Sequence, residues 1–113
     1  MKRELQDDTI YERQAQLCKM LSHPTRLKIL NELKQSEKTV NELVEILGIS
    51  QPTVSQHLSE LKQRGLVGSE RDGVSVKYRL KHPEIMEACK TIRNVLFEQF
   101  SEDKKLLKDK EVK

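Results

Sequence analysis

The sequence predicts a mainly α-helical chain with one β-hairpin, in the order α-α-α-α-β-β-α. Two patterns predict it. Apolar residues recur every three to four positions through most of the chain, and between residues 66 and 80 they alternate with polar residues instead. The composition favours a homodimer, because only 35% of the 113 residues are apolar and another 35% are charged. A chain this small buries little surface, so we expect a thin core that a subunit interface supplements.

Two helices open the predicted fold. Apolar residues seven and eleven positions after Ile10 share one side of a helix over Asp8–Leu21. The segment Ser22-His23-Pro24 interrupts it, because a proline forces the preceding residue out of the helical region and suits the first turn of a new helix. Leucines at every third position from Leu27 then predict a second helix over Pro24–Lys34.

A short third helix is expected over Val40–Leu47. Thr39 and Glu42 match a capping box at its start, and Gly48 suits a left-handed helix end. Ser50 is a favourable N-cap for the next helix. The short connection predicts that the third and fourth helices form a helix-turn-helix.

The fourth helix is expected over Gln51–Arg64. Its buried stripe should consist of Val54, Leu58 and Leu61, which follow i, i+4, i+7 spacing. The opposite face is polar and almost free of acidic groups up to Glu60. It shows Gln51, Thr53, Ser55, Gln56, Ser59 and Gln63. Glutamines and hydroxyls both donate and accept hydrogen bonds, as base edges require, so we expect this helix to enter a DNA major groove.

A hairpin and a final helix complete the chain. Arg71-Asp72-Gly73 separates two strand-like runs, and Val74, Val76, Tyr78 and Leu80 alternate with polar residues in the second. The hairpin makes the motif a winged helix-turn-helix. The last helix is expected over about Pro83–Phe100, with room to extend further, followed by a charged tail over 101–113 that frays. The whole, 1–113, is interpreted as one domain with its core at about 8–100.

Positive charge gathers near the predicted DNA-binding surface. The formal net charge is +3, and residues 51–81 hold six basic against three acidic side chains, whereas the rest of the chain is balanced. Lys62, Arg64 and Arg71 are the candidate phosphate contacts. His57 has two open alternatives, contact with DNA or packing under the helix. A winged-helix module that binds proteins rather than DNA is a second class of function, and the polar, non-acidic helix face argues against it.

The motifs resemble a known family. Residues 21–30 (LSHPTRLKIL), 43–58 (LVEILGISQPTVSQHL), 61–67 (LKQRGLV) and 71–80 (RDGVSVKYRL) together resemble the ArsR/SmtB family of bacterial and archaeal repressors, over about residues 12–100. The resemblance implies a homodimer, formed through the first and last helices, that binds an operator and leaves it when an inducer binds. Two-fold symmetry then predicts an inverted-repeat operator, with recognition helices about 34–36 Å apart. It also implies that His57 lies close to DNA.

The inducer is less defined by the sequence. Members of the family sense metals, metalloids, oxidants or reactive sulfur. The cysteine pair of the arsenic/cadmium type is missing from the third helix, and at the zinc-type positions Val95 cannot bind a metal. Cys18 and Cys89 lie on the apolar stripes of the first and last helices and are candidate redox or reactive-sulfur sensors, provided that their Cα atoms approach within about 7 Å. Alternatively, the two cysteines are small core residues, or the protein has a metal- or metalloid-responsive site.

Other classes of protein find little support. The sequence has no catalytic nucleophile–base motif, glycine-rich phosphate loop or His-Glu-x-x-His motif, so we predict neither an enzyme nor a cofactor. No apolar run reaches the roughly 18 residues of a membrane span, and no secretion signal is evident, so a cytoplasmic location is expected.

Overall fold

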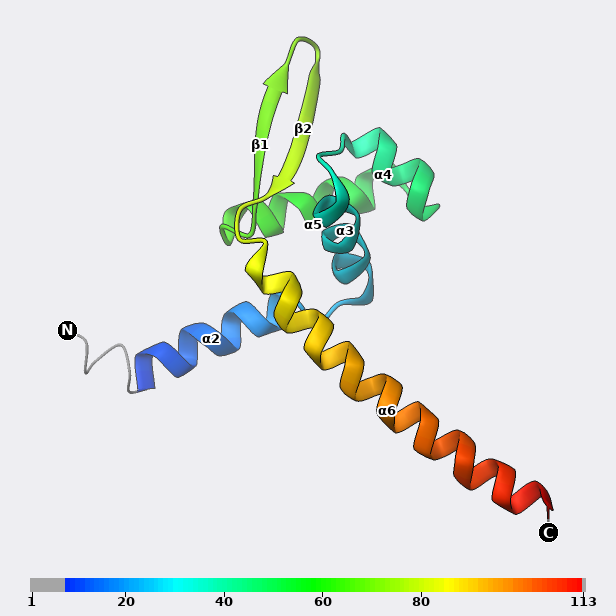
Figure 1. Ribbon diagram of the computed structural model, residues 1–113. Helices are drawn as coiled ribbons and strands as arrows, with labels where there is room; N and C mark the ends of the chain where they lie inside the picture. The colour runs from blue at the N-terminus through cyan, green and yellow to red at the C-terminus, as the bar shows by residue number, and fades with distance from the viewer. Residues whose placement is uncertain (1–7, 113) are drawn as a thin grey trace. The chain divides into compact units, whose positions relative to one another are not determined.

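A computed structural model describes residues 8–112, with the side chains of residues 8–105. The elements are α2 (Asp8–Met20), α3 (Pro24–Gln35), α4 (Val40–Leu47), α5 (Gln51–Gln63), β1 (Val67–Asp72), β2 (Ser75–Leu80) and α6 (Glu84–Val112) (Figure 1). The predicted order is confirmed. The chain divides between His82 and Pro83 into two compact units, the second of which is α6.

The first unit is built on an apolar centre shared by its helices and hairpin. Ile29 of α3, Leu43 of α4 and Val54, Leu58 and Leu61 of α5 have no exposed surface. The predicted buried stripe of α5 is therefore confirmed. Leu66 and Val67 at the start of the hairpin are also buried, so the base of β1 closes this core.

Local capping explains where the helices of the helix-turn-helix begin and end. The Thr39 hydroxyl accepts from the Glu42 backbone N–H, and the Glu42 carboxylate accepts from that of Thr39, as the capping box predicts. These hydrogen bonds lower the pKa of Glu42. Gly48 then ends α4 at φ 66° and ψ 32°, a left-handed conformation that is costly for other residues. The turn between α4 and α5 is thereby fixed.

The hairpin differs from the prediction at its tip. β1 and β2 pair antiparallel from Val67 opposite Leu80 to Asp72 opposite Ser75, so Arg71 and Asp72 belong to the strand. The two-residue turn is Gly73-Val74, with Gly73 at φ 65°, because a glycine at the first central position matches the twist of the strands. Val74 is consequently 99% exposed rather than part of a covered strand face.

A buried lysine joins the hairpin to α3. The backbone of Lys38 exchanges two hydrogen bonds with Tyr78 of β2, at 3.1 and 2.8 Å. Its ammonium is buried and donates to the Glu32 carbonyl at 2.7 Å and to the Ser36 hydroxyl at 3.0 Å. Lys38 therefore supplies a positive charge to the carboxyl end of α3, where the helix dipole favours one.

The second unit, α6, is longer than expected. It continues to Val112, beyond the Phe100 at which the sequence pattern placed its approximate end. The segment after Phe100 contains no glycine or proline and is rich in Lys, Leu and Glu, which have high helix propensity. Within the described side chains, Met86 and Cys89 are buried, whereas apolar residues further along are exposed.

Candidate nucleic-acid interface

The outward side of α5 is polar and accessible. Gln51, Gln56, Ser59 and Gln63 are exposed, and Thr53 and Ser55 are half-buried. All stand on a helix whose opposite side is fully buried, so their backbone positions are set by the core. The face contains donors and acceptors without a carboxylate among these six residues, which is the chemistry needed to contact base edges.

The first turn of α5 is organised by its own side chains. The Ser50 hydroxyl caps the helix by accepting from the Thr53 backbone N–H at 3.4 Å, and the two hydroxyls lie 2.8 Å apart. The Gln51 side-chain amide donates to the Ser55 hydroxyl at 3.0 Å. These exposed hydrogen bonds hold Gln51, Thr53 and Ser55 in one arrangement.

His57 lies on the flank of α5 that packs on α3. Its Nδ1 accepts a hydrogen bond from the Arg26 Nε at 3.2 Å, and its ring meets that of His23 edge-on, with centroids 4.5 Å apart. Burial, followed by the neighbouring charges of His23 and Arg26, lowers the pKa of His57. Of the two alternatives for His57, this geometry favours packing under the helix.

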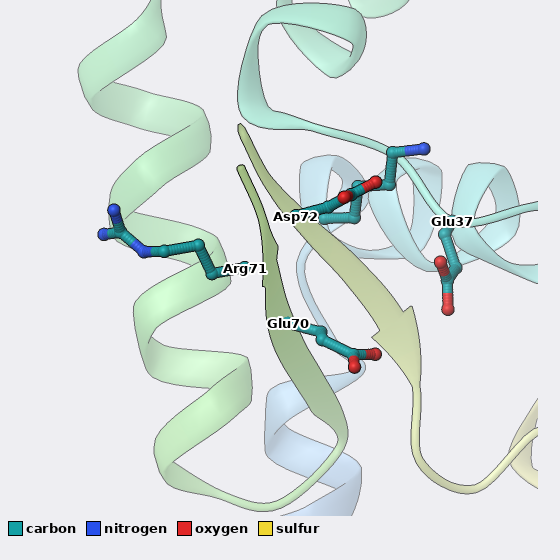
Figure 2. Close-up of a pocket in the computed structure, with 5 residues that line it drawn as sticks. Glu37, Glu70, Arg71 and Asp72 are labelled. Atoms are coloured by element: carbon teal, nitrogen blue, oxygen red, sulfur yellow. The ribbon is translucent and has the colours of Figure 1, made fainter. Parts of the chain in front are cut away.

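The basic candidates surround α5 and the hairpin. The Lys62 ammonium donates to the Ser69 hydroxyl at 2.6 Å and so links α5 to β1, while Arg64 is exposed at the carboxyl end of α5. Glu70, Arg71 and Asp72 all line a shallow hollow of about 250 Å³, and the side chain of Arg71 extends away from those of Glu70 and Asp72 (Figure 2). Its guanidinium is thus separated from the acidic side of the wing.

Comparison with known proteins agrees with this geometry. The model of the "Bacterial regulatory protein, arsR family" matches residues 23–69, which include the helix-turn-helix. An HTH-type transcriptional regulator of Mycobacterium tuberculosis, Rv0081, is 31% identical over 106 residues, or 93% of each chain. This protein belongs to the ArsR/SmtB family. It is thus a DNA-binding transcriptional regulator of a family that includes repressors.

Relatives of this ArsR/SmtB-family regulator share its fold. The crystal structure of Rv0081 has a TM-score of 0.75 at 32% identity and covers 85% of this chain and 97% of that chain. The solution structure of the homodimeric winged helix-turn-helix DNA-binding domain Mb0332 from Mycobacterium bovis has a TM-score of 0.72 at 28% identity, covering 81% and 85%. The repressor SmtB of M. tuberculosis is 44% identical over 71 residues, which are 63% of this chain and 53% of SmtB.

The two candidate sensor residues of this ArsR/SmtB-family chain differ in environment. Both are free thiols, but Cys18 is exposed on α2 and Cys89 is 7% exposed on α6. Across the described residues, no group of three or more His, Cys, Asp or Glu side chains is placed to share a metal ion. No helix within this described part is both long and apolar enough to cross a membrane.

The sequence-based reasoning about this ArsR/SmtB-family chain missed Arg26. Its guanidinium contacts three other side chains, including that of Glu60 on α5. The available signal was one arginine in the first turn of α3, two residues after its initial proline. Periodicity shows that such a residue lies near a buried face, but it does not show which partner on another helix it meets.

Proposed function

We propose that the protein is a homodimeric repressor that inserts α5 of each subunit into the major groove of an inverted-repeat operator and is released by an inducer. The single observation that supports this most strongly is the two-sided character of α5. Its inner side has no exposed surface at Val54, Leu58 and Leu61, while its outer side presents uncharged hydrogen-bonding groups. A helix fixed in this way is suited to reading base edges.

The contacts divide into two kinds under this proposal. Gln51, Thr53, Ser55, Gln56 and Ser59 contact base edges or the adjacent backbone, with His57 close behind them. Lys62, Arg64 and Arg71 contact phosphates, which fixes the orientation of the protein on the duplex. The exposed outer positions and the direction of Arg71 away from the acidic residues of the wing support this division (Figure 2).

We assign the dimer interface to α2 and α6, so that both units contribute to one DNA-binding domain. In the single chain, α6 exposes a run of large apolar side chains, and α2 exposes Ile10 and Tyr11. The α6 residues are Ile92, Val95, Leu96, Phe97 and Phe100, at 44–63% exposure. Apolar surface of this extent favours association. The similarity to the homodimeric Mb0332 domain supports the formation of a dimer.

The direct test is DNA binding by the purified protein. A duplex is selected by the wild-type protein from a random library of about 30 base pairs, long enough for two half-sites one helical turn apart. Fluorescence anisotropy then measures its Kd and that of a scrambled duplex at several salt concentrations. We expect a selected inverted repeat and a steep salt dependence from counterion release. Failure to bind either duplex at low salt contradicts the proposal and favours the protein-interaction module.

We propose further that a thiol signal through Cys18 and Cys89 releases the operator. With hydrogen peroxide as oxidant, each thiol loses one electron and one proton, an S–S bond forms, and the peroxide leaves as two water molecules. Because Cys18 is exposed, it is open to oxidant, whereas Cys89 is shielded. Tying the first helix to the last would alter how the two protomers sit and hence the spacing of the recognition helices.

The thiol proposal is tested by titrating the selected duplex before and after treatment with peroxide or, separately, tetrasulfide. Wild-type affinity should fall at least tenfold and recover with dithiothreitol, whereas Cys18→Ser and Cys89→Ser should not respond. Unchanged wild-type affinity after both treatments contradicts it. If zinc or cadmium ions instead lower the affinity for the selected duplex, and both serine variants keep this response, the result would support a metal-responsive repressor.

A further inference from the structure

One guanidinium joins three elements of the first unit. Arg26 of α3 donates from Nε to the His57 Nδ1 at 3.2 Å, and its Nη2 is ion-paired with the Glu60 carboxylate, both on α5. Its Nη1 lies 3.4 Å from the sulfur of Met20, the last residue of α2. The Arg26 side chain is only 15% exposed and that of Glu60 is 38% exposed, so these contacts are partly shielded from water.

The two anchored residues of α5 stand next to the proposed base-reading positions. His57 and Glu60 are three residues apart and therefore lie on the same flank of the helix. Gln56 and Ser59 immediately precede them and are exposed on the outer side. A rotation of α5 about its axis would move His57 and Glu60 together with Gln56 and Ser59. Holding the first two residues therefore also fixes the direction of the other two.

Apolar packing sets the position of α5 but restrains its rotation less tightly than hydrogen bonds of fixed direction do. Val54, Leu58 and Leu61 bury the inner side of α5, and hydrophobic contact is non-directional. A planar guanidinium with donors in fixed directions imposes orientation as well as proximity. Binding groups must be held within about 10–20° of their productive geometry, so this additional constraint matters for DNA recognition more than for folding.

We propose that Arg26 is a positioning residue for DNA binding, which sets the rotation of α5 through His57 and Glu60 and links it to the end of α2. This inference rests on the proposed function. Arg26 itself does not contact DNA, because its guanidinium is covered and its donors are directed at protein groups. Its effect is exerted through the exposed side of α5.

The experiment compares Arg26→Met with Lys28→Met. Both substitutions are in α3 and both remove one positive charge, but Lys28 is exposed. Kd is measured for the selected and the scrambled duplex, and urea unfolding gives the folded fraction, so that all Kd values refer to folded protein. We expect Arg26→Met to weaken binding to the selected duplex at least tenfold and to change binding to the scrambled duplex less than threefold. Lys28→Met should leave the ratio of the two Kd values unchanged.

Two further variants separate positioning from folding. Arg26→Lys retains a charge for Glu60 but lacks the planar fork of the guanidinium. The ratio of the scrambled-duplex Kd to the selected-duplex Kd should therefore lie between the ratios of the wild type and Arg26→Met. Glu60→Gln should also lower the ratio of the scrambled-duplex Kd to the selected-duplex Kd relative to the wild type. The NMR amide signals of Gln56 and Ser59 should shift in the variants. Equal ratios for Arg26→Met and Lys28→Met overturn the positioning role while the DNA-binding function stands. Failure of the wild-type protein to select any duplex overturns both.

Discussion

Among single residues, Lys38 is a charged side chain that the fold buries to 8% exposure. Its ammonium satisfies carbonyl and hydroxyl acceptors at the end of α3, contributed by Glu32 and Ser36. We therefore expect Lys38→Met to lower the free energy of unfolding by about 1–3 kcal/mol, because these part-buried acceptors lose a charged donor. Urea unfolding measures the effect. Lys34→Met, which removes an exposed lysine near the end of α3, is the control, and equal midpoints for both variants would contradict the prediction.

His57 gives a second residue-scale prediction, concerning pH. Its pKa is lowered in the folded protein, mainly by burial, so the unfolded chain takes up the proton first as pH falls. Stability is therefore complete above the ordinary histidine pKa of about 6.5 and declines as pH falls below it. Unfolding in urea at about pH 7.5 and 5.5 brackets this range. The wild type should lose more stability than His57→Gln, and an equal loss would show that His57 does not contribute.

The sequence-based predictions were most accurate for residues that cap or end a helix through backbone groups close to them in sequence. Thr39, Gly48 and Ser50 cap or end helices as their residue types predict, because these effects need only neighbours in sequence. His57 could not be assigned in this way, since it stands at the border between the buried and exposed sides of α5. Its environment depends on Arg26 and His23, which approach from α3 and the turn before it, and no periodicity encodes that meeting.

Among the elements, the hairpin shows a limited error of the sequence pattern. Asp-Gly indicated a turn correctly, but the strand continues through Arg71 and Asp72 and the turn falls on Gly73-Val74. The reason is that the strand ends are set by hydrogen-bond pairing across the hairpin, which reading one strand at a time does not show. The end of α6 was placed early for a different reason: the apolar stripe stops at Phe100, whereas the helix-forming residues after it continue the helix to Val112.

The position of Arg71 in β1 leads to a prediction for the wing as an element. Arg71→Ala should weaken binding to the selected and scrambled duplexes by similar factors and reduce the slope of log Kd against log salt by about 0.9, since one phosphate contact releases about one counterion. Arg79→Ala is the matched control, because it removes the same charge from the same hairpin and Arg79 is already paired with Glu70 at 3.5 Å. An unchanged salt slope in Arg71→Ala would exclude a phosphate contact.

At the scale of the whole molecule, the composition predicted a thin core that a subunit interface supplements. The first unit has a closed core, yet α6 exposes Phe97 and Phe100 to more than half of their surface. The sequence identified apolar stripes on the first and last helices but could not distinguish a stripe buried within the chain from one reserved for a partner. That distinction depends on how much of each stripe the same chain covers, which only coordinates reveal.

The exposed stripe of α6 gives the last prediction. Ile92 is 63% exposed, so Ile92→Glu leaves the folded single chain intact but places a charge where we assign the dimer contact. We expect sedimentation to show a monomer and the Kd for the selected duplex to rise at least tenfold, because one subunit engages only one half-site. Asn94→Glu adds the same charge on the opposite side of the helix and should remain dimeric. A dimeric Ile92→Glu variant with wild-type Kd would move the interface away from this stripe, and with it the symmetry that the inverted-repeat operator requires.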